Sequence, residues 1–243
     1  MPFDDVTVVV LAGGKGSRLK GLHPETPKPI IPVAGKPFLH WLTLWLASHG
    51  PQHFVFSTGY RGEQIEAWAA GGDFPASEQV CCRETEPLGT GGGLLNCLDY
   101  CRRWVLVANG DGLVMKGVSE LLAMHDELGI DGGLLGVPVE DASRYGSLIV
   151  DAESRLTGFR EKVAGRGMIN GGLYLFRTEM LREMRRPDML SLEYDLFPEM
   201  IENGATLGVV QLDAAPFIDI GTPETLAQAE AFVRQHLMQP SPP

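Results

Sequence analysis

The sequence has no long apolar run, no basic block and no CxxC pair among its four cysteines. No stretch approaches the roughly 20 uncharged residues that a membrane-spanning helix needs. The first residues, MPFDD, are acidic where a secretory signal is basic. We therefore expect a cytoplasmic protein without membrane insertion. Because the net charge is −11 and no basic stripe is present, we do not expect nucleic-acid binding.

Common nucleophile and metal motifs are missing as well. The sequence has no HExxH motif, no GxSxG elbow and no Ser/His/Asp order, so a covalent nucleophile has no candidate. Cys97 and Cys101 form a CxxxC pair that could bind a metal together with Cys81 and Cys82. We favour the alternative, free buried thiols in a reducing compartment.

Strand and helix signals alternate over the first half of the chain. This order predicts an α/β fold with a doubly wound parallel sheet, whose ligands bind at the carboxyl ends of the strands. In the second half we expect a hairpin, one further strand and two helices. The expected strands are 6–12, 53–58, 79–83, 104–108 and 171–177, the hairpin is 147–162, and the helices are 37–49, 63–70, 92–101, 193–203 and 223–237.

The first strand ends in a glycine-rich loop, LAGGKGSRL, at residues 11–19. It is not a Walker A loop, because Gly14-Lys15 is followed by Gly16, and it is not a dinucleotide fingerprint, because Leu19 stands where the third glycine would be. Three glycines can still turn backbone N–H groups toward one anion, and Lys15 and Arg18 add positive charge. The loop therefore predicts phosphate binding. A flexible connection with solvated cations is the alternative.

A proline-rich segment, PETPKPIIPVAGKP, follows at residues 24–37. Its five prolines predict a stiff, extended backbone, with Lys28 held between two of them. A lysine on such a backbone is a well-placed point charge. The alternative is a solvent-exposed lysine in a connector.

Acidic residues stand at three further strand ends. Glu84 begins ETEPLGTGGG, Asp111 ends NGD, and Asp219 lies in FIDIG. The two aspartates could share Mg²⁺, which takes few protein ligands plus substrate oxygens. Glu84 could accept hydrogen bonds from a base, and a carboxylate suits the two adjacent donors of guanine. The alternatives are a solvated loop acid and turn-capping aspartates.

A last group of motifs suits a phosphorylated sugar. FREK ends with Glu161 and Lys162, INGGLY contains Asn170, and RYGSL contains Gly146. Glu161 and Asn170 could bind hydroxyl groups and Lys162 the phosphate. A solvated ion pair beside a hairpin turn is the alternative.

Taken in order, these motifs resemble those of the sugar-1-phosphate nucleotidylyltransferases. The markers are LAGGKGSRL, TPKPIIPVAGKP, EPLGTGGG, NGD, FREK, NGGLYLF, SLEYD and FIDIGTPE. The resemblance extends from Val8 to about Ala231. Within the family, the short length and the second-half motifs look most like the D-glycero-α-D-manno-heptose 1-phosphate guanylyltransferases. Mannose 1-phosphate guanylyltransferases and N-acetylmuramate or hexose 1-phosphate uridylyltransferases are similar too.

The resemblance implies a role for each matching residue. It places catalysis on Arg18, Lys28, Asp111 and Lys162, and Mg²⁺ on Asp111 and Asp219. It places the nucleotide on Leu11, Ala12, Gly13, Gly14, Lys15, Gly16, Ser17, Glu84, Pro87, Leu88, Gly89, Thr90, Asn109 and Gly110. It places the sugar on Tyr145, Gly146, Glu161, Lys162, Asn170, Gly171 and Glu193. One departure is Gly112, where many relatives carry a larger residue, so the metal site could be looser.

The resemblance also implies a Rossmann-like mixed sheet in one domain, residues 1–236, with a small sugar-binding lobe. We expect the nucleotide-binding half at about 1–112, the sugar-phosphate-binding half at about 113–236, and a flexible tail at 237–243. A homodimer is left open.

The implied reaction joins an NTP, for which we expect GTP, to a sugar 1-phosphate, with an NDP-sugar and pyrophosphate as products. Such products feed surface polysaccharide synthesis. Two other classes of protein remain as alternatives. A non-catalytic nucleotide-sugar sensor would not need Arg18, Lys28, Asp111, Lys162 and Asp219 together. A NAD-dependent dehydrogenase would need the missing fingerprint.

Overall fold

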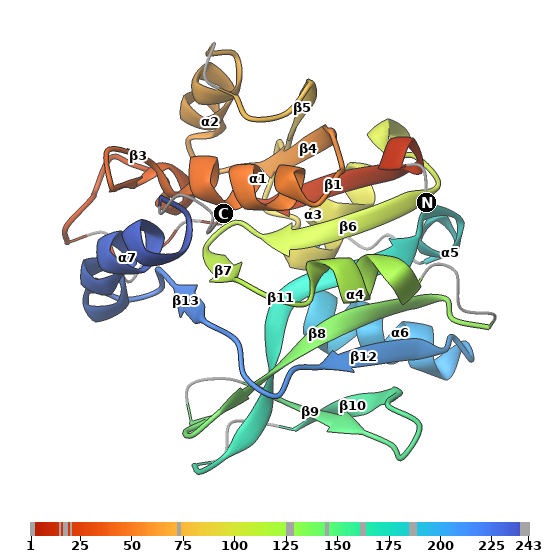
Figure 1. Ribbon diagram of the computed structural model, residues 1–243. Coiled ribbons are helices and arrows are strands. Elements are labelled where there is room, and N and C mark those ends of the chain that lie inside the picture. The colour runs from red at the N-terminus through yellow and green to blue at the C-terminus, as the bar shows by residue number, and fades with distance from the viewer. Residues whose placement is uncertain are drawn as a thin grey trace.

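A computed structural model describes residues 3–14, 16, 19, 21–71, 74–124, 129–143, 146–160, 164–184 and 189–238 (Figure 1). The strands are β1 (Val6–Leu11), β2 (Pro32–Val33), β3 (Lys36–Pro37), β4 (His53–Thr58), β5 (Glu78–Arg83), β6 (Trp104–Asn109), β7 (Gly112–Val114), β8 (Gly132–Val139), β9 (Ser147–Val150), β10 (Leu156–Arg160), β11 (Gly167–Arg177), β12 (Leu207–Gln211) and β13 (Phe217–Asp219). The α-helices are α1 (Phe38–Ser48), α2 (Gly62–Ala69), α3 (Gly89–Asn96), α4 (Val118–Ala123), α5 (Thr178–Arg182), α6 (Phe197–Glu202) and α7 (Pro223–His236). Shorter elements are the 3₁₀ turns Phe3–Asp5, Lys28–Ile30 and Leu98–Tyr100 and the π-helix Leu192–Leu196.

The first half of the chain builds the parallel part of the sheet. β1 lies between β4 and β6, and β5 pairs with β4, all in parallel. The valines of β1 are buried on both faces, because helices cover both faces. Leu11 lies opposite Ser57 on β4 and Asn109 on β6, so these strands end together. The predicted doubly wound arrangement is confirmed.

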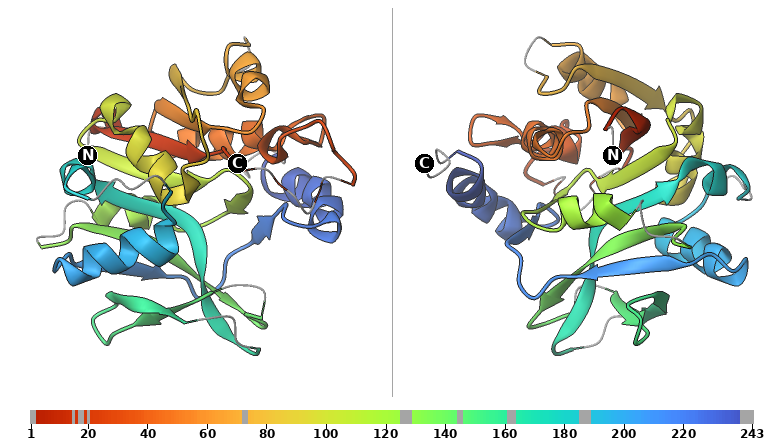
Figure 2. Two further views of the ribbon diagram at one scale, coloured as in Figure 1. Left: turned by 180° about the vertical axis from the view of Figure 1, so that it is seen from behind. Right: turned by 45° about the vertical axis from the view of Figure 1, so that its right-hand side comes forward.

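The second half turns the sheet into a mixed one. β11 is antiparallel to β6 through residues 173–177, and its earlier part pairs with β8 and touches β9. β12 joins β8 in parallel, and β10 joins β9 as the predicted hairpin. The long strand β11 runs from the parallel sheet into the lobe that carries β9 and β10 (Figure 1 and Figure 2). The two expected halves of the chain therefore share one sheet.

Helices on the two faces enclose two apolar clusters. One cluster includes side chains of α1, α2, α4 and α7, and the other includes side chains of α3, α5 and α6. α7 also packs beside β2, next to the proline-rich segment (Figure 1). A capping box at Thr222 starts α7 directly after β13. This packing fixes the position of Asp219 at the end of β13.

Two predicted helices need correction, and several elements were not predicted. The helix expected at 92–101 starts at Gly89 and ends at Asn96, and a 3₁₀ turn follows. A Cβ on Gly91 would lie 3.0 Å from the Leu196 side chain, so close packing outweighs the low helix propensity of glycine. The helix expected at 193–203 is a π-helix followed by α6. The unexpected elements include β7, β8, β12, α4 and α5.

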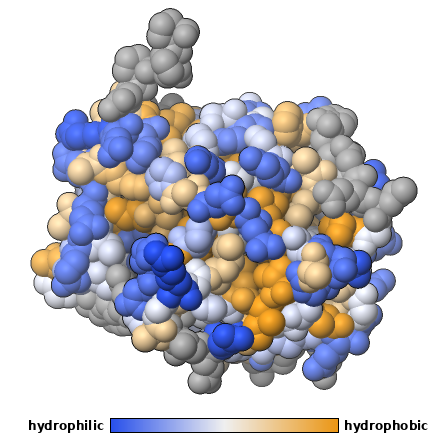
Figure 3. Space-filling view, turned by 60° about the horizontal axis from the view of Figure 1, so that its bottom comes forward, coloured by the Kyte–Doolittle hydropathy of each residue, from blue (hydrophilic) through white to orange (hydrophobic). Residues whose placement is uncertain are grey.

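The surface has both polar and apolar areas. Among the described residues, no helix is long and apolar enough to cross a membrane. One face shows hydrophobic surface gathered between hydrophilic residues (Figure 3). The most exposed large apolar side chains of the described residues are Tyr194 and Met189. Met189 borders the cavity described next.

Candidate active site

A cavity of about 680 Å³ opens at the carboxyl ends of the parallel strands. Its wall combines the loops that follow β1, β4, β5 and β6, as expected for a doubly wound sheet. Thirteen of the lining residues were predicted from the sequence: Leu11, Ala12, Gly13, Gly14, Gly16, Lys28, Glu84, Pro87, Gly89, Thr90, Asn109, Gly110 and Asp111. Leu88 belongs to the same loop but not to the wall.

The glycine loop is held against the neighbouring strands by its backbone. Ala12 N donates to Ser57 O at 2.9 Å, and Tyr60 N donates to Gly13 O at 3.1 Å. A Cβ on Gly13 would lie 2.9 Å from Glu84 Oε1, whereas a Cβ on Gly14 would meet nothing within 4 Å. Gly13 is therefore packed and Gly14 is open. Lys15, Ser17 and Arg18, the other predicted residues of this loop, lie outside the described residues.

Lys28 enters the cavity from a 3₁₀ turn. The proline-rich segment is not extended throughout, as the sequence predicted, because Lys28–Ile30 forms this turn, with Pro29 buried in it. Glu25, three residues before Lys28, is held by two contacts: Arg61 Nη2 contacts its Oε2, and Gln64 Nε2 donates to its backbone O at 2.8 Å. These contacts tie the segment to α2 and so fix the backbone that carries Lys28.

The Lys28 ammonium contacts the carboxylate of Asp111. The Lys28 side chain is 15% exposed and that of Asp111 is 40% exposed. Asp219 comes to the same place because β13 pairs with β7, with Asp219 opposite Gly112, and because Ile220 N donates to Asp111 O at 2.9 Å. A Cβ on Gly221 would lie 3.6 Å from Lys28 Nζ and would overlap Asp219 Oδ1. Asp219 is therefore close to the Lys28–Asp111 pair, but its side chain lines a smaller neighbouring cavity rather than the one described above.

Steric crowding does not require a glycine at position 112. A Cβ there would meet Ile218 O only at 3.8 Å, an ordinary contact. An alanine would therefore fit at this position without moving β13.

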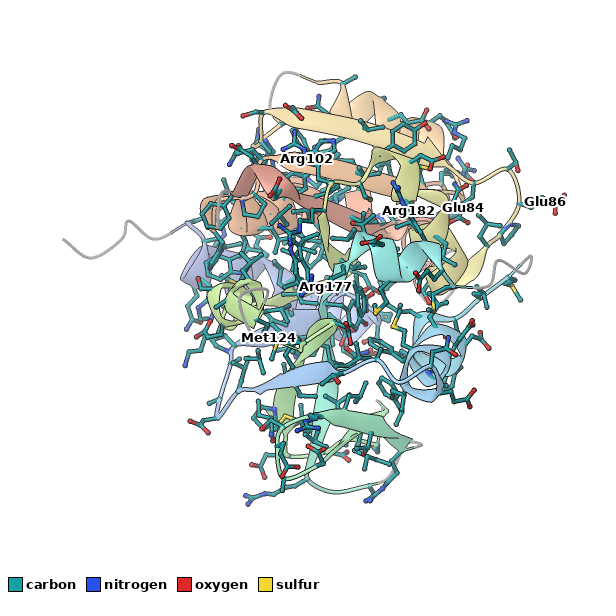
Figure 4. All side chains as sticks on the ribbon, turned by 90° about the vertical axis from the view of Figure 1, so that its right-hand side faces the viewer. Glu84, Glu86, Arg102, Met124, Arg177 and Arg182 are labelled. Carbon is teal, nitrogen blue, oxygen red and sulfur yellow. The ribbon has the colours of Figure 1, made fainter. Side chains whose placement is uncertain are left out.

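Glu84 is held in place by its own surroundings. Its Oε1 accepts from Ser57 Oγ at 3.1 Å, and its Oε2 accepts from Leu88 N at 3.1 Å. A Cβ on Gly93 would lie 2.7 Å from Oε1, so Glu84 fits a niche that only glycine leaves open. Figure 4 shows Glu84 against the body of the protein and Glu86 at the outer edge of the same loop. Each Glu84 oxygen keeps a lone pair for a further donor.

The predicted sugar-binding residues Asn170 and Glu193 lie together. Asn170 Nδ2 donates to Glu193 Oε1 at 2.7 Å and to the hydroxyl of Tyr174 at 2.9 Å. The Tyr174 hydroxyl also bonds Asn109 at the cavity, and burial, helped by the charge of Glu193, raises the pKa of Tyr174. The phenol thus stays protonated at physiological pH and links the two ends of the site.

Other predicted sugar residues have different surroundings. Gly171 packs against β8, because a Cβ there would lie 3.0 Å from Val137 Cγ2. Gly146 lies before β9, near Arg160 O of β10. Tyr145, Glu161 and Lys162 lie outside the described residues.

Comparison with known proteins identifies the fold and its relatives. The family model "Nucleotidyl transferase" matches residues 7–236. The chain belongs to this family. It is 33% identical over 234 residues to a mannose-1-phosphate guanylyltransferase of Mycobacterium tuberculosis, covering 95% of this chain and 65% of that protein, so it spans just under two thirds of that relative. It is 30% identical over 231 residues to a D-glycero-alpha-D-manno-heptose 1-phosphate guanylyltransferase of Aneurinibacillus thermoaerophilus, covering 94% and 99%.

The structure is also similar to a solved one. HddC from Yersinia pseudotuberculosis, crystallised with GMP-PN, superposes with a TM-score of 0.80 at 32% identity, covering 93% of this chain and 98% of that chain. The family identification and the fold class predicted from the sequence are confirmed.

Nucleotidyl transferases of this family generally depend on a divalent metal. Within the described part of the chain, no cluster of three or more His, Cys, Asp or Glu side chains could hold one. Asp111 and Asp219 offer two carboxylates. The cysteines form no such cluster in the described part of the chain either, and burial raises the pKa of Cys81 to about 11 and that of Cys101 to about 12.

Seven residues of the cavity wall were not predicted: Pro29, Ser57, Gly59, Tyr60, Thr85, Glu86 and Met189. Ser57, Gly59 and Tyr60 carry a usable signal, because STGYRG follows a predicted strand just as the other motifs do. Met189 carries none, since it reaches the site only through tertiary structure.

Proposed function

We propose that the protein transfers a nucleoside monophosphate from GTP to a sugar 1-phosphate, with release of pyrophosphate. The observation that carries this proposal is the meeting of Lys28, Asp111 and the open glycine loop in one cavity. Family membership supports nucleotidyl transfer, and the guanylyltransferase names of the relatives favour GTP and a sugar 1-phosphate.

In this reaction an oxygen of the sugar phosphate attacks the α-phosphorus of the nucleotide. A new P–O bond forms as the bond to the β-phosphate oxygen breaks, and the electron pair leaves with pyrophosphate. Two anions must meet, so the chain's main tasks are alignment and neutralisation of charge. Lys28 can neutralise charge at the reacting phosphate, and the backbone at Gly14 leaves room for phosphate oxygens.

We assign Mg²⁺ binding to Asp111 and Asp219. Two carboxylates held by adjacent strands suit a cation that takes few protein ligands and completes its shell with substrate oxygens. When bound, the metal would supply further neutralisation of phosphate charge. Lys28, whose ammonium contacts Asp111, would offset part of the negative charge of the two carboxylates.

Guanine preference is assigned to Glu84. Its two acceptor oxygens match the N1–H and 2-amino donors of guanine, while uracil and thymine offer a single donor. Loss of one such partner costs about 1–3 kcal/mol, or roughly ten- to a hundredfold in kcat/KM. The hydrogen bonds from Ser57 and Leu88 would orient the carboxylate for this contact.

The sugar end is assigned to Asn170 and Glu193, together with Lys162, Glu161, Tyr145, Gly146 and Gly171. A heptose 1-phosphate is our first choice of substrate, because the Aneurinibacillus relative is matched over nearly its whole length. Mannose 1-phosphate is the second, because the Mycobacterium relative is the more similar in sequence.

The test is a pyrophosphate-release assay with GTP, ATP, UTP, dTTP and CTP against heptose 1-phosphate and mannose 1-phosphate. We expect the highest kcat/KM with GTP. A higher kcat/KM with UTP or dTTP would refute the preference for GTP but not the assignment of nucleotidyl transfer. Glu84→Gln should erase the GTP preference. Ser57→Ala is its matched control: it removes one hydrogen bond to Glu84 but keeps the carboxylate, so it should retain the preference.

A further inference from the structure

Met189 combines two properties that rarely occur together. Its side chain is 69% exposed, and it borders the 680 Å³ cavity. Tyr194 is the other large apolar side chain of similar exposure among the described residues, and it does not line the cavity. Exposed apolar surface in the wall of a ligand cavity usually serves the ligand.

The backbone beside Met189 is fastened to the loop that follows β5. Leu190 N donates to Leu88 O at 2.8 Å, and Leu190 O accepts from Gly91 N at 2.8 Å and from Gly92 N at 3.3 Å. Two residues further, Leu192 N donates to Thr90 Oγ1 at 2.9 Å. The fold therefore fixes the backbone beside Met189 before any ligand arrives, so only the side chain has to be ordered on binding.

The contacts of the docked loop show which part of a nucleotide Met189 would meet. Leu88, whose carbonyl oxygen accepts from Leu190 N, also donates its own N–H to Glu84 Oε2 at 3.1 Å. Glu84 is the carboxylate assigned above to the base, whereas Lys28 and Asp111, assigned to phosphate and metal, meet beyond the end of β6. Met189 therefore borders the cavity beside the residue assigned to the base.

We propose that Met189 covers one face of the nucleobase and is an affinity determinant for purine nucleotides. The proposal rests on the nucleotide binding in the function proposed above. A flexible thioether packs well against an aromatic face, and a purine offers it more area than a pyrimidine. Such a contact does not depend on the hydrogen-bonding groups of the base. It should therefore increase the affinity for GTP and for ATP equally, and discrimination between them would depend on other residues.

Three variants test this: Met189→Ala, Met189→Leu, which keeps the apolar volume, and Met238→Ala. Met238 is the matched control, a methionine 46% exposed beyond α7 and outside the cavity wall. Dissociation constants for GTP, ATP and UTP would be measured by calorimetry, beside KM and kcat from pyrophosphate release and a thermal melt. Met189→Ala should raise Kd and KM for GTP and ATP about tenfold, and those for UTP less. KM for the sugar phosphate should stay within about twofold, and Met189→Leu and Met238→Ala should match wild type.

Unchanged GTP binding in a folded Met189→Ala protein would overturn the proposal, and so would an equal loss in Met238→Ala. A change confined to the sugar phosphate would also overturn it. If the wild-type protein binds GTP but releases no pyrophosphate with any combination of NTP and sugar 1-phosphate, the proposed function is refuted. The ratio of the GTP dissociation constants of Met189→Ala and wild type then still tests the role of Met189. If wild type binds no nucleotide, both fall.

Discussion

Gly89→Ala is the sharpest test of how the cavity is assembled. Gly89 starts α3 with a φ of +73°, and an added Cβ would overlap the carbonyl oxygen of Leu190. Gly204, after α6, has a φ of +83°, but a Cβ there would meet nothing within 4 Å. The two positions therefore share the left-handed backbone and differ in the clash, so Gly204→Ala is a matched control.

The expected magnitudes follow from these contacts. Left-handed strain costs about 1–2 kcal/mol in either variant. In Gly89→Ala the clash should also break the hydrogen bonds from Leu190 N to Leu88 O and from Gly91 N to Leu190 O, at about 1 kcal/mol each. Because 1 kcal/mol lowers the Tm of a chain of this size by about 2–4 °C, we expect a drop of about 2–8 °C for Gly204→Ala and about 6–16 °C for Gly89→Ala.

Thermal unfolding and pyrophosphate-release kinetics on the same preparations check both parts. KM for the NTP should rise about tenfold in Gly89→Ala, because displacement of the loop is expected to cost roughly 1.4 kcal/mol of binding free energy. It should not change in Gly204→Ala. Equal Tm values and equal KM values for the two variants would refute the idea that docking of Leu190 shapes the nucleotide site.

Three further predictions concern charge. Asp111→Asn should keep the fold, as checked by circular dichroism, but lower kcat in Mg²⁺ by about 10²–10⁴, because several kcal/mol of transition-state stabilisation are lost; a near-normal kcat would refute the metal assignment. Lys28→Ala should lower kcat, whereas Lys162→Ala should raise KM for the sugar phosphate; loss of NTP affinity alone in both would contradict this division. Burial, followed by the charge of Arg102, lowers the pKa of His53 in the folded protein below its usual 6.5. As the pH falls below about 6.5, His53 therefore takes up a proton more readily in the unfolded chain than in the folded protein, and the free energy of unfolding decreases. Urea unfolding between pH 7.5 and 5 should show this loss, and His53→Gln should reduce it; an unchanged slope would exclude His53 as its source.

The parallel half of the fold was predictable because its signals are local. β1 begins with five buried β-branched residues, and His53–Thr58 was predicted with the bounds that β4 has. A glycine or proline follows each of these strands within four residues, so the ends of the strands could be predicted from the sequence. The motifs at those ends then had to converge, since parallel strands end at one edge of the sheet.

The remaining elements depend on packing between distant residues. α3 begins in a glycine run, which propensity alone assigns to a turn, but Gly93 must lack a side chain to make room for Glu84 and Ser57. The glycine-rich strand β8 has little β propensity of its own, and its pairing with β11 and β12 determines it. No local pattern predicts the π-helix, because its start depends on the Ser191 cap and on Thr90 of another loop.

The same difference separates the predicted and the missed residues of the site. Lys28 and Asp111 were found because each stands in a motif with an obvious chemical use. Met189 was missed, because nothing around it in the sequence indicates that Leu190 pairs with a loop about 100 residues earlier. Residues in motifs of recognisable chemistry could be predicted, whereas a residue that reaches the cavity only through tertiary packing could not.

The two expected halves of the chain, divided near residue 112, are joined by side-chain hydrogen bonds. Leu192 of the π-helix Leu192–Leu196 contacts Thr90 in the loop after β5, and Glu193 of the same helix contacts Asn170. Asn170 bonds the Tyr174 hydroxyl, which interacts with Asn109 at the end of β6. These contacts cross the division twice, so the second half of the chain supports the loop after β5 and the end of β6. A substitution in the π-helix is therefore expected to disturb both Thr90 and Asn170.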